Sequence, residues 1–498
     1  MVLLCLAAVL AAAGPGWAAD ILFSTFVNTQ SNGIARDATF DKSGNLYIAG
    51  GGAGFERADL TFDYKTERGG DSRGRFYPYD VFVQKYGAHG RLLWTVRLGG
   101  EGYDRAYALE IDRQGNILVA GRAGAGFPTT AGAYQEHFGG NSKETIVRAY
   151  GKQDGFVVKL DGGTGPLLWS TYIGGSSGEL IRDIAAGPDG AVNIALTNVR
   201  SAAGQPISGD GARKQLAGRT DAIFARLAGD GRRLLYGTFI GSSGLANNDG
   251  SNPSIIADAK GDINMVMMMG SDGAPTTRRA WASQRRGDTD LYLVKFDGAS
   301  GGRRIKAATY FGTKGGDYLE THNLAIDAQG NFIVAAATNG RGLPTGRDAA
   351  QRAFAGGKSD GFAAVISADG RRVIAATYLG GKGADNLEGI AYHQGRIYVS
   401  GKTSSQILPA AGISLKNKQG GGQNALMLVL PSSLTRIIDS AYLGGSQKDQ
   451  GRALAVAADG RIAVGGSAGS ADFPVKRASD LSKQGRSAPF VTVFHPIN

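Results

Sequence analysis

The stretch LLWSTYIGG (residues 167–175) decides the fold, because close copies of it recur along the chain. The stretch is rich in aromatic and β-branched residues, Trp169, Thr171, Tyr172 and Ile173, which is typical of a β-strand. The copies are LLWTVRL (92–98), LLYGTFI (234–240), IKAATYF (305–311), VIAATYL (373–379) and IIDSAYL (437–443). Successive copies begin about 64 to 75 residues apart. A strand that returns at this period indicates an array of similar structural units.

Three more strands precede each copy. Two of them flank a Gly-containing turn, as in NLAIDAQGNFIVAA (323–336), and this pattern predicts a hairpin. The third begins with an acidic or amide residue, as in DGFVVKL (154–160). That first residue is Asp or Asn in six of the seven units, so we interpret it as structural; the six are Asp80, Asp154, Asp221, Asp290, Asp360 and Asn424.

The two ends of the chain supply one unit between them. APFVTVF (488–494) is a seventh third strand with no fourth strand after it, and ILFSTFV (21–27) is a fourth strand with nothing before it. We therefore predict an all-β, seven-bladed β-propeller of four-stranded antiparallel blades, closed when strand 21–27 joins strand 488–494. Closure removes the free sheet edges at which chains aggregate. Unit four departs most from the repeat at residues 239–254, so its first strand is the least well defined.

The units resemble the seven-bladed β-propeller repeat (SBBP) family of bacterial surface and secreted proteins. The residues that carry the resemblance are STYIGG (170–175), DAQGN (327–331) and FPTTAGAYQ (127–135). The resemblance covers the chain from residue 19 onward and implies a secreted or surface-displayed propeller. It implies no common enzymatic activity, cofactor or catalytic residue.

The first 18 residues form an apolar stretch that ends in small residues, which predicts a signal peptide. Residues 19–498 are then one propeller domain, exported to the periplasm, the cell surface or the medium. The single cysteine, Cys5, lies in the predicted signal peptide, so the mature chain has no disulfide. No later segment is apolar and long enough to predict a membrane span.

Positive charge concentrates in the long links between the second and third strands of the units. These links hold about half of the 54 Lys and Arg residues but fewer than a third of the 43 Asp and Glu residues. We expect them to lie on one face of the ring and to attract polyanions there. The candidate binding residues are Arg213, Lys214, Arg219, Arg278, Arg279, Trp281, Arg285, Arg286, Lys476 and Arg477. The alternative is a solvated, Arg-rich surface without a ligand.

A second candidate site is the mouth of the central channel. Charged residues recur where the first strand of a unit begins, and the candidates there are Arg36, Arg182, His322 and Arg452. Such a ring could bind a small ligand or an ion. The alternative is that Arg and Asp residues of neighbouring blades pair with one another.

No catalytic or metal-binding motif stands out, so the sequence predicts no catalytic residue, metal or cofactor. The first hypothesis is a monomeric binding module whose basic loop face holds an anionic polysaccharide, lipopolysaccharide or a protein partner, with nucleic acid bound only non-specifically. The second is a polysaccharide-active lyase or hydrolase with its site at the channel mouth.

Overall fold

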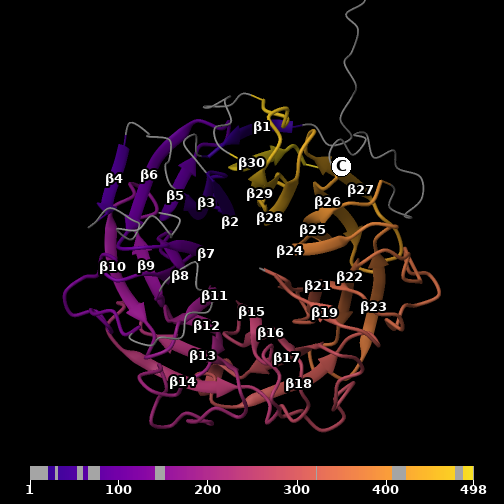
Figure 1. Cartoon of the computed structure of the whole chain (residues 1–498), viewed down its shortest axis with the longest axis horizontal. Helices are drawn as coiled ribbons and strands as arrows, with labels where there is room; N and C mark the ends of the chain where they lie inside the picture. The colour runs from indigo at the N-terminus through magenta and orange to yellow at the C-terminus, as the bar shows by residue number, and fades with distance from the viewer. Residues whose placement is uncertain are drawn as a thin grey trace, which may run out of the picture.

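The computed structural model describes residues 21–27, 32–52, 60–65, 79–140, 152–320, 322–406, 422–476 and 486–496. Within this part of the chain, seven blades stand around a central axis, and the chain visits them in order around the ring (Figure 1). Each blade is an antiparallel sheet whose consecutive strands step outward from the axis to the rim. The predicted seven-bladed propeller is confirmed.

The four strand positions repeat from blade to blade. The innermost strands are β2 (Gly33–Phe40), β7 (Arg105–Ile111), β11 (Leu180–Ala186), β15 (Ser251–Ala257), β24 (Asp385–His393), β28 (Asp449–Val456) and, in the fifth blade, the pair β19 (Asp317–Tyr318) and β20 (Leu324–Ile326). The second strands are β3 (Leu46–Gly52), β8 (Ile117–Ala123), β12 (Val192–Val199), β16 (Ile263–Met269), β21 (Phe332–Thr338), β25 (Arg396–Thr403) and β29 (Ile462–Ala468). The third strands are β5 (Asp80–Tyr86), β9 (Asp154–Leu160), β13 (Asp221–Leu227), β17 (Asp290–Phe296), β22 (Asp360–Ile366), β26 (Asn424–Pro431) and β30 (Ala488–Phe494). The outer strands are β6 (Leu92–Gly99), β10 (Leu167–Ile173), β14 (Leu234–Ile240), β18 (Ile305–Phe311), β23 (Val373–Leu379), β27 (Asp439–Leu443) and β1 (Ile21–Phe26). In addition, β4 (Leu60–Lys65) pairs with β6 in parallel, and a 3-10 turn covers Gly298–Ser300.

The ring closes as the sequence predicts. β1 pairs antiparallel with β30, from Ile21 opposite Phe494 to Phe26 opposite Phe490. The hydroxyls of Ser24 and Thr492 lie 2.8 Å apart and add a side-chain hydrogen bond to this pairing. The last blade therefore takes its outer strand from the opposite end of the chain.

In several hairpin turns between a first and a second strand, an aspartate at the start of the turn holds the backbone in place. Asp41 Oδ1 accepts hydrogen bonds from the backbone N–H groups of Ser43 and Asn45, and Gly44 between them has a φ of 76°. Only glycine adopts such a φ without strain from a Cβ atom. Asp112 and Asp327 make the same pair of bonds in their own turns.

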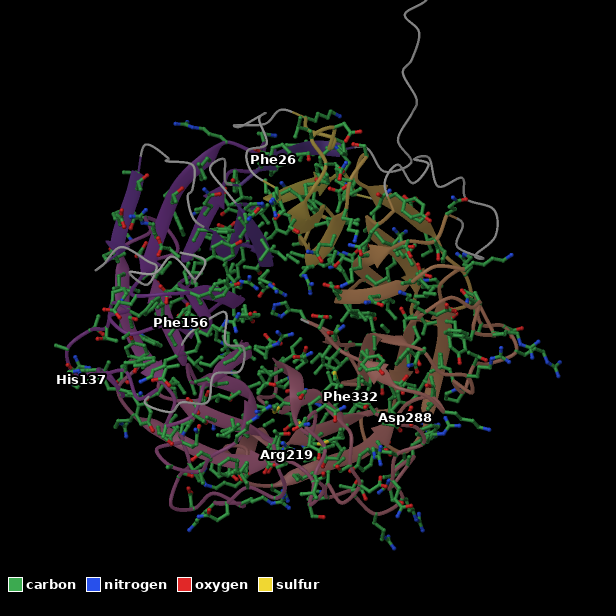
Figure 2. The ribbon with its side chains drawn as sticks, viewed as in Figure 1. Phe26, His137, Phe156, Arg219, Asp288 and Phe332 are labelled. Carbon is green, nitrogen blue, oxygen red and sulfur yellow. The ribbon has the colours of Figure 1, made fainter. Side chains whose placement is uncertain are left out.

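Apolar side chains on the faces of each blade pack against the neighbouring blades. One apolar cluster joins Val83 and Trp94 of the first blade to Leu109 and Phe156 of the second. Figure 2 marks Phe26, Phe156 and Phe332, three buried rings from three different blades. The core is thus a series of apolar layers between neighbouring sheets.

Acidic side chains meet at the joints between blades. Asp154 opens β9, accepts a hydrogen bond from the N–H of Gly139 at 2.7 Å and lies beside Glu179 of the third blade. Burial, with Glu179 as a neighbour, raises the pKa of Asp154 to about 8, so the two carboxyls share a proton near neutral pH. Similar pairs are Asp221 with Asp249, Asp290 with Asp317, and Asp360 with Asp385. At one further joint Asn424 takes the place of the aspartate and lies beside Asp449.

The long links do not stay on one face, which corrects the sequence-based expectation. Each of several links runs along the outer strand of its own blade: Tyr172 N–H donates to Gln135 O, Tyr310 N–H to Ala282 O, and Tyr378 N–H to Gln351 O. A link also reaches the next blade, as where Trp281 N–H donates to Gly370 O at 2.8 Å. We call the described parts of the long links that pair in this way with an outer strand the outer belt. They cover the exposed edge of the outer strand, which would otherwise offer unpaired N–H and C=O groups.

The most irregular inner strand belongs to the fifth blade, not to the fourth as predicted. β15 of the fourth blade pairs with β16 like its counterparts, apart from one register shift. In the fifth blade the inner strand is interrupted between β19 and β20. In the part of the chain that the structure describes, no helix is long and apolar enough to cross a membrane.

Candidate functional site

One residue in the inner strand of most blades is left out of the strand ladder. The ladder shifts register between Ala35 and Asp37, between Ala106 and Ala108, and at the matching place in four other blades. The residues at these β-bulges are Arg36, Tyr107, Arg182, Asn252 with Pro253, Glu388 and Arg452. A bulge redirects its side chain, and here it supplies different side chains on an otherwise repeated scaffold.

These side chains form a cluster rich in arginine. We call it the axial cluster and define it as Arg36, Arg105, Tyr107, Arg122, Arg182, Glu320, Glu388, Lys402 and Arg452. In Figure 2 side-chain nitrogen atoms gather around the centre of the ring. The members come from six blades, so the cluster exists only when the ring is assembled.

Arg36 and Arg182 are buried without acceptors among the described residues. Arg36 is 8% exposed and Arg182 is 7% exposed. Nε and Nη1 of Arg36 and Nε and Nη2 of Arg182 have no hydrogen-bond partner, and no described carboxylate forms an ion pair with either side chain. Burial, together with repulsion from Arg452 and Arg105, lowers the pKa of Arg36 to about 9. Burial also lowers the pKa of Arg182 to about 10.

Tyr107 lies among four guanidinium groups. The centre of its ring is 5.0 Å from Cζ of Arg36, 5.1 Å from that of Arg182, 5.5 Å from that of Arg122 and 5.7 Å from that of Arg105. Arg105 Nη1 lies 3.5 Å from the phenolic oxygen as its donor. Burial opposes ionisation, but the four arginines outweigh it and lower the pKa of Tyr107 to about 6.

Two other cations of the cluster, Arg452 and Lys402, are paired with carboxylates. Arg452 Nη1 lies 2.6 Å from Glu388 Oε2 and 3.0 Å from Glu320 Oε2, and Lys402 Nζ lies 2.6 Å from Glu388 Oε1. Although burial raises the pKa of Glu320, its basic neighbours, Arg452 foremost, bring it down to about 2. Paired and unpaired arginines therefore coexist in one cluster.

His322 follows the break in the fifth inner strand and reaches residues of other blades. Its Nε2 lies 3.2 Å from Asp37 Oδ2 and 2.9 Å from the carbonyl oxygen of Tyr107, and its Nδ1 lies 3.2 Å from Asp183 Oδ1. Burial opposes the charged imidazolium, but Asp37 and Asp183 raise the pKa of His322 to about 10. Both ring nitrogens are thus engaged, and the histidine holds together two carboxylates rather than facing a substrate.

Arg213 and the arginines of the fourth blade's link are spread along the outer belt. Arg278 and Arg279 lie in the exposed turn that Ala280 N–H closes onto Thr277 O. Arg286 is exposed; its Nη1 donates to Gly312 O, and its guanidinium stacks over Trp281, which itself packs on Phe311. Arg285 donates to the carbonyls of Gly287 and Asp288, and Arg213 to that of Gly241.

The remaining candidates of the links are also separate. Lys214 and Arg219 are exposed, and Lys476 pairs through its backbone with Ser24. Figure 2 labels Arg219 and also His137, which lies at the outer edge of the ring. Arg477 lies outside the described residues, as do residues 1–18. The predicted basic loop residues therefore do not converge on one place.

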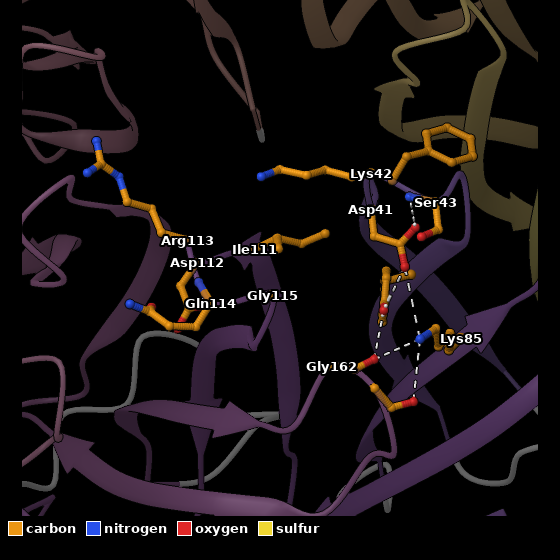
Figure 3. Close-up of a pocket in the computed structure, with 13 residues that line it drawn as sticks. Asp41, Lys42, Ser43, Lys85, Ile111, Asp112, Arg113, Gln114, Gly115 and Gly162 are labelled. Atoms are coloured by element: carbon orange, nitrogen blue, oxygen red, sulfur yellow. Dashed lines mark hydrogen bonds and ion pairs between the residues drawn. The ribbon is translucent and has the colours of Figure 1, made fainter.

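A pocket of about 890 Å³ opens between the first and second blades at their hairpin turns (Figure 3). Lys85 Nζ and Tyr47 Oη both donate to Gly162 O, at 2.8 and 2.7 Å, and so link the two blades. Lys42 and Arg113 extend away from this network in Figure 3. The buried polar groups of this pocket are satisfied by the protein itself, in contrast to those of the axial cluster.

The sequence found part of the axial site. It named Arg36, Arg182, His322 and Arg452, which the structure places around one axis. It missed Tyr107, Arg105, Arg122 and Glu320. Tyr107 could have been found, because it occupies the place of Arg36 in the repeat when IARDATFD (34–41) is aligned with RAYALEID (105–112). Among the described residues, no group of three or more His, Cys, Asp or Glu side chains could hold a metal ion.

Comparison with known proteins shows similar solved structures but no family. No family model matches the chain, and no curated protein matches it, so the resemblance to the SBBP repeat remains a prediction. A protein of unknown function from Dyadobacter fermentans is 11% identical, with a TM-score of 0.44, over 96% of this chain and 100% of that one. An ulvan lyase from a new polysaccharide lyase family is 10% identical, with a TM-score of 0.42, over 91% and 92%. The quinohemoprotein alcohol dehydrogenase of Comamonas testosteroni is 10% identical, with a TM-score of 0.41, over 97% and 77%.

Proposed function

We propose that this protein is an exported binding module that recognises an anionic group of its ligand at the axial cluster. The observation that carries the proposal is the pair Arg36 and Arg182, whose buried N–H groups lack acceptors among the described residues. A buried charged donor without a partner destabilises a fold by more than a neutral one. An oxyanion placed between the two side chains would satisfy these donors.

The chemistry of the donors defines the ligand class. A guanidinium group binds carboxylate, sulfate or phosphate through two parallel hydrogen bonds. Anionic polysaccharide and lipopolysaccharide both carry such groups. The basic residues of the outer belt add a long-range attraction that salt screens, but they do not define the binding site.

Binding of purified protein to anionic polysaccharide and lipopolysaccharide, measured with two matched double variants, tests this proposal. Arg36→Gln with Arg182→Gln removes two charges at the axis, and Arg278→Gln with Arg279→Gln removes two from the belt. We expect the axial variant to lose about 100-fold or more in affinity, because it removes buried charged contacts. The belt variant should change the affinity by less than about threefold at physiological salt. Equal losses in both variants, or unchanged binding by the axial variant, would contradict the proposal.

Tyr107 favours one alternative, a lyase that acts on acidic polysaccharide. An ionised phenol beside arginines that hold a carboxylate can remove the proton on the neighbouring carbon. The C–H electrons then form a C=C bond, the glycosidic oxygen leaves, and the phenol returns its proton to that oxygen. Incubation with uronate-containing polysaccharide should then yield unsaturated ends in the wild type and none in Tyr107→Phe. Binding without any unsaturated product excludes this alternative and leaves the binding module.

A further inference from the structure

Besides Glu320 and Glu388, the axial cluster contains a third group that can act as an internal anion, Tyr107. Glu320 and Glu388 are engaged by Arg452 and Lys402. Among the described residues, no carboxylate forms an ion pair with Arg36 or Arg182, and both face the ring of Tyr107, 5.0 and 5.1 Å from its centre. Tyr107 is 3% exposed, so water screens these charges little.

From this geometry we propose that Tyr107 is the internal counter-ion of the axial arginines, and that an oxyanion ligand replaces it while the phenolate takes up one proton. The inference rests on the proposed function, because it concerns the same site. No covalent bond changes: phenolate, proton and free oxyanion become phenol and bound oxyanion. The site is therefore a proton-coupled anion site for carboxylate or sulfate groups.

Side chains from several strands contribute to the charge environment of Tyr107. The cations are Arg36 on β2, Arg105 on β7 itself, Arg122 on β8, Arg182 on β11 and Arg452 on β28. Glu320 is the acid of the axial cluster that lies near Arg36 and Arg182. Among the described residues around Tyr107, the cations named here outnumber the acids, which favours the ionised phenol.

A second group of titrating residues meets the backbone of Tyr107. It consists of His322, which contacts the Tyr107 carbonyl, with Asp37, Asp183 and Glu110. Burial raises the pKa of Asp37 to about 7 and that of Glu110 to about 8. These two acids also titrate near neutral pH, so the experiment has to separate their protons from that of Tyr107.

The direction of the pH dependence follows from linkage. The four arginines hold the pKa of Tyr107 at about 6 in the free protein. A bound oxyanion neutralises them and raises that pKa, so binding takes up a proton at pH values between about 6 and the higher pKa of Tyr107 in the complex. Affinity should then fall about tenfold for each pH unit above about 6 and level off below it.

The test uses sulfate and D-glucuronate as probes, because neither changes its charge between mildly acidic and mildly alkaline pH. Calorimetry in two buffers of different ionisation enthalpy measures the proton uptake, and near-ultraviolet difference absorbance follows ionised tyrosine. The wild type should take up about one proton at pH 8 and lose ionised-tyrosine absorbance on binding. Tyr107→Phe should take up none and bind about 100-fold more tightly than the wild type at pH 8, since the internal anion is gone.

Tyr103→Phe is the matched control, because Tyr103 also faces Arg105 and Arg122, each 4.7 Å from its ring centre. This variant should keep the pH slope. Proton uptake that persists in Tyr107→Phe would assign it to Asp37 or Glu110 and overturn the inference. Binding of the probes by the wild type with no pH slope and no proton uptake overturns the inference but not the proposed function. If neither probe binds at any pH, the inference and the proposed function both fail. A preference for one probe distinguishes sulfated from carboxylated ligands.

Discussion

The axis and the blade joints use the same repeat in opposite ways. At the joints the repeat places an acid in nearly every blade, such as Asp154, Asp221, Asp290 and Asp360, and each lies beside another carboxyl. At the axis the bulged residue changes from blade to blade, and within the described part of the chain buried donors of Arg36 and Arg182 lack acceptors. A residue type that every unit repeats holds the units together. A position whose residue differs between units can instead combine several side chains into one specific site.

The two regions also differ in how they handle burial of like charges. At the joints burial and a nearby carboxyl raise the pKa of an aspartate, which favours its protonated form. Arginine does not lose its proton at ordinary pH, so the axial cluster needs an anion. This difference is why we place ligand binding at the axis and structural cohesion at the joints.

The largest expected effect comes from breaking the network beneath the axial cluster. His322→Ala leaves Asp37 and Asp183 without the cation between them, and we expect a loss of about 3–5 kcal/mol in the free energy of unfolding. The pKa of His322 is raised to about 10, so its stabilisation is fully present below the pKa of an unfolded histidine and is lost as pH rises through about 10. Urea unfolding at pH 7 measures the loss. The control is His137→Ala, at an exposed position of the outer edge, which should change the free energy of unfolding by less than about 0.5 kcal/mol. Equal losses in the two variants would contradict the role of His322 as the cation between Asp37 and Asp183.

A smaller effect is expected where a bulge needs close approach of the backbone. Gly121 on β8 is paired with Ala106 next to the bulge, and a Cβ there would overlap the carbonyl oxygen of Arg105. Gly121→Ala should destabilise the protein by roughly 1–3 kcal/mol. It should also strengthen anion binding at pH 8, because displacing Tyr107 removes the internal anion from Arg36 and Arg182. Gly209→Ala is the matched control, because no atom lies near the Cβ position of Gly209. Thermal unfolding of the two variants compares their stability. Unchanged binding by a folded Gly121→Ala protein would show that the bulge does not position Tyr107.

The smallest expected effect concerns the carboxyl pairs at the blade joints. Asp154→Asn places an amide donor where the carboxyl pair has a proton, and Asn424 is the natural example in another blade. The free energy of unfolding should change by less than about 1 kcal/mol at pH 7. Because the folded-state pKa of Asp154 is raised to about 8, the wild type loses stability as pH rises from about 4 to about 8. The variant should lose less over that range.

The reverse change, Asn424→Asp, creates a new carboxyl pair with Asp449 and should make the loss steeper. Unfolding midpoints in urea at pH 5 and pH 8 measure both slopes. Parallel slopes in all three proteins would mean that the joints do not share protons.

The sequence was sufficient for the blades but only partly for the site. Strand period and turn glycines predict each hairpin, and the strands at 21–27 and 488–494 predict the closure, because both depend on local pattern. Arg36 and Arg182 stood out as charges in apolar strands. Tyr107 did not, because an aromatic residue in a strand is usually part of the core. The path of the long links was wrong because backbone pairing of Ala282 with Tyr310 leaves no pattern in side-chain polarity.

The pairing of β1 with β30 has a consequence for how the chain folds. Ser24 and Thr492, which meet in this pairing, are 468 residues apart in sequence. Contacts at such separation form late and slowly, because the entropy of closing so long a loop opposes them. Six blades can assemble as the chain is made, whereas the seventh cannot form until β30 is available. Since the axial side chains come from blades on both sides of this closure, the binding site is a late product of folding.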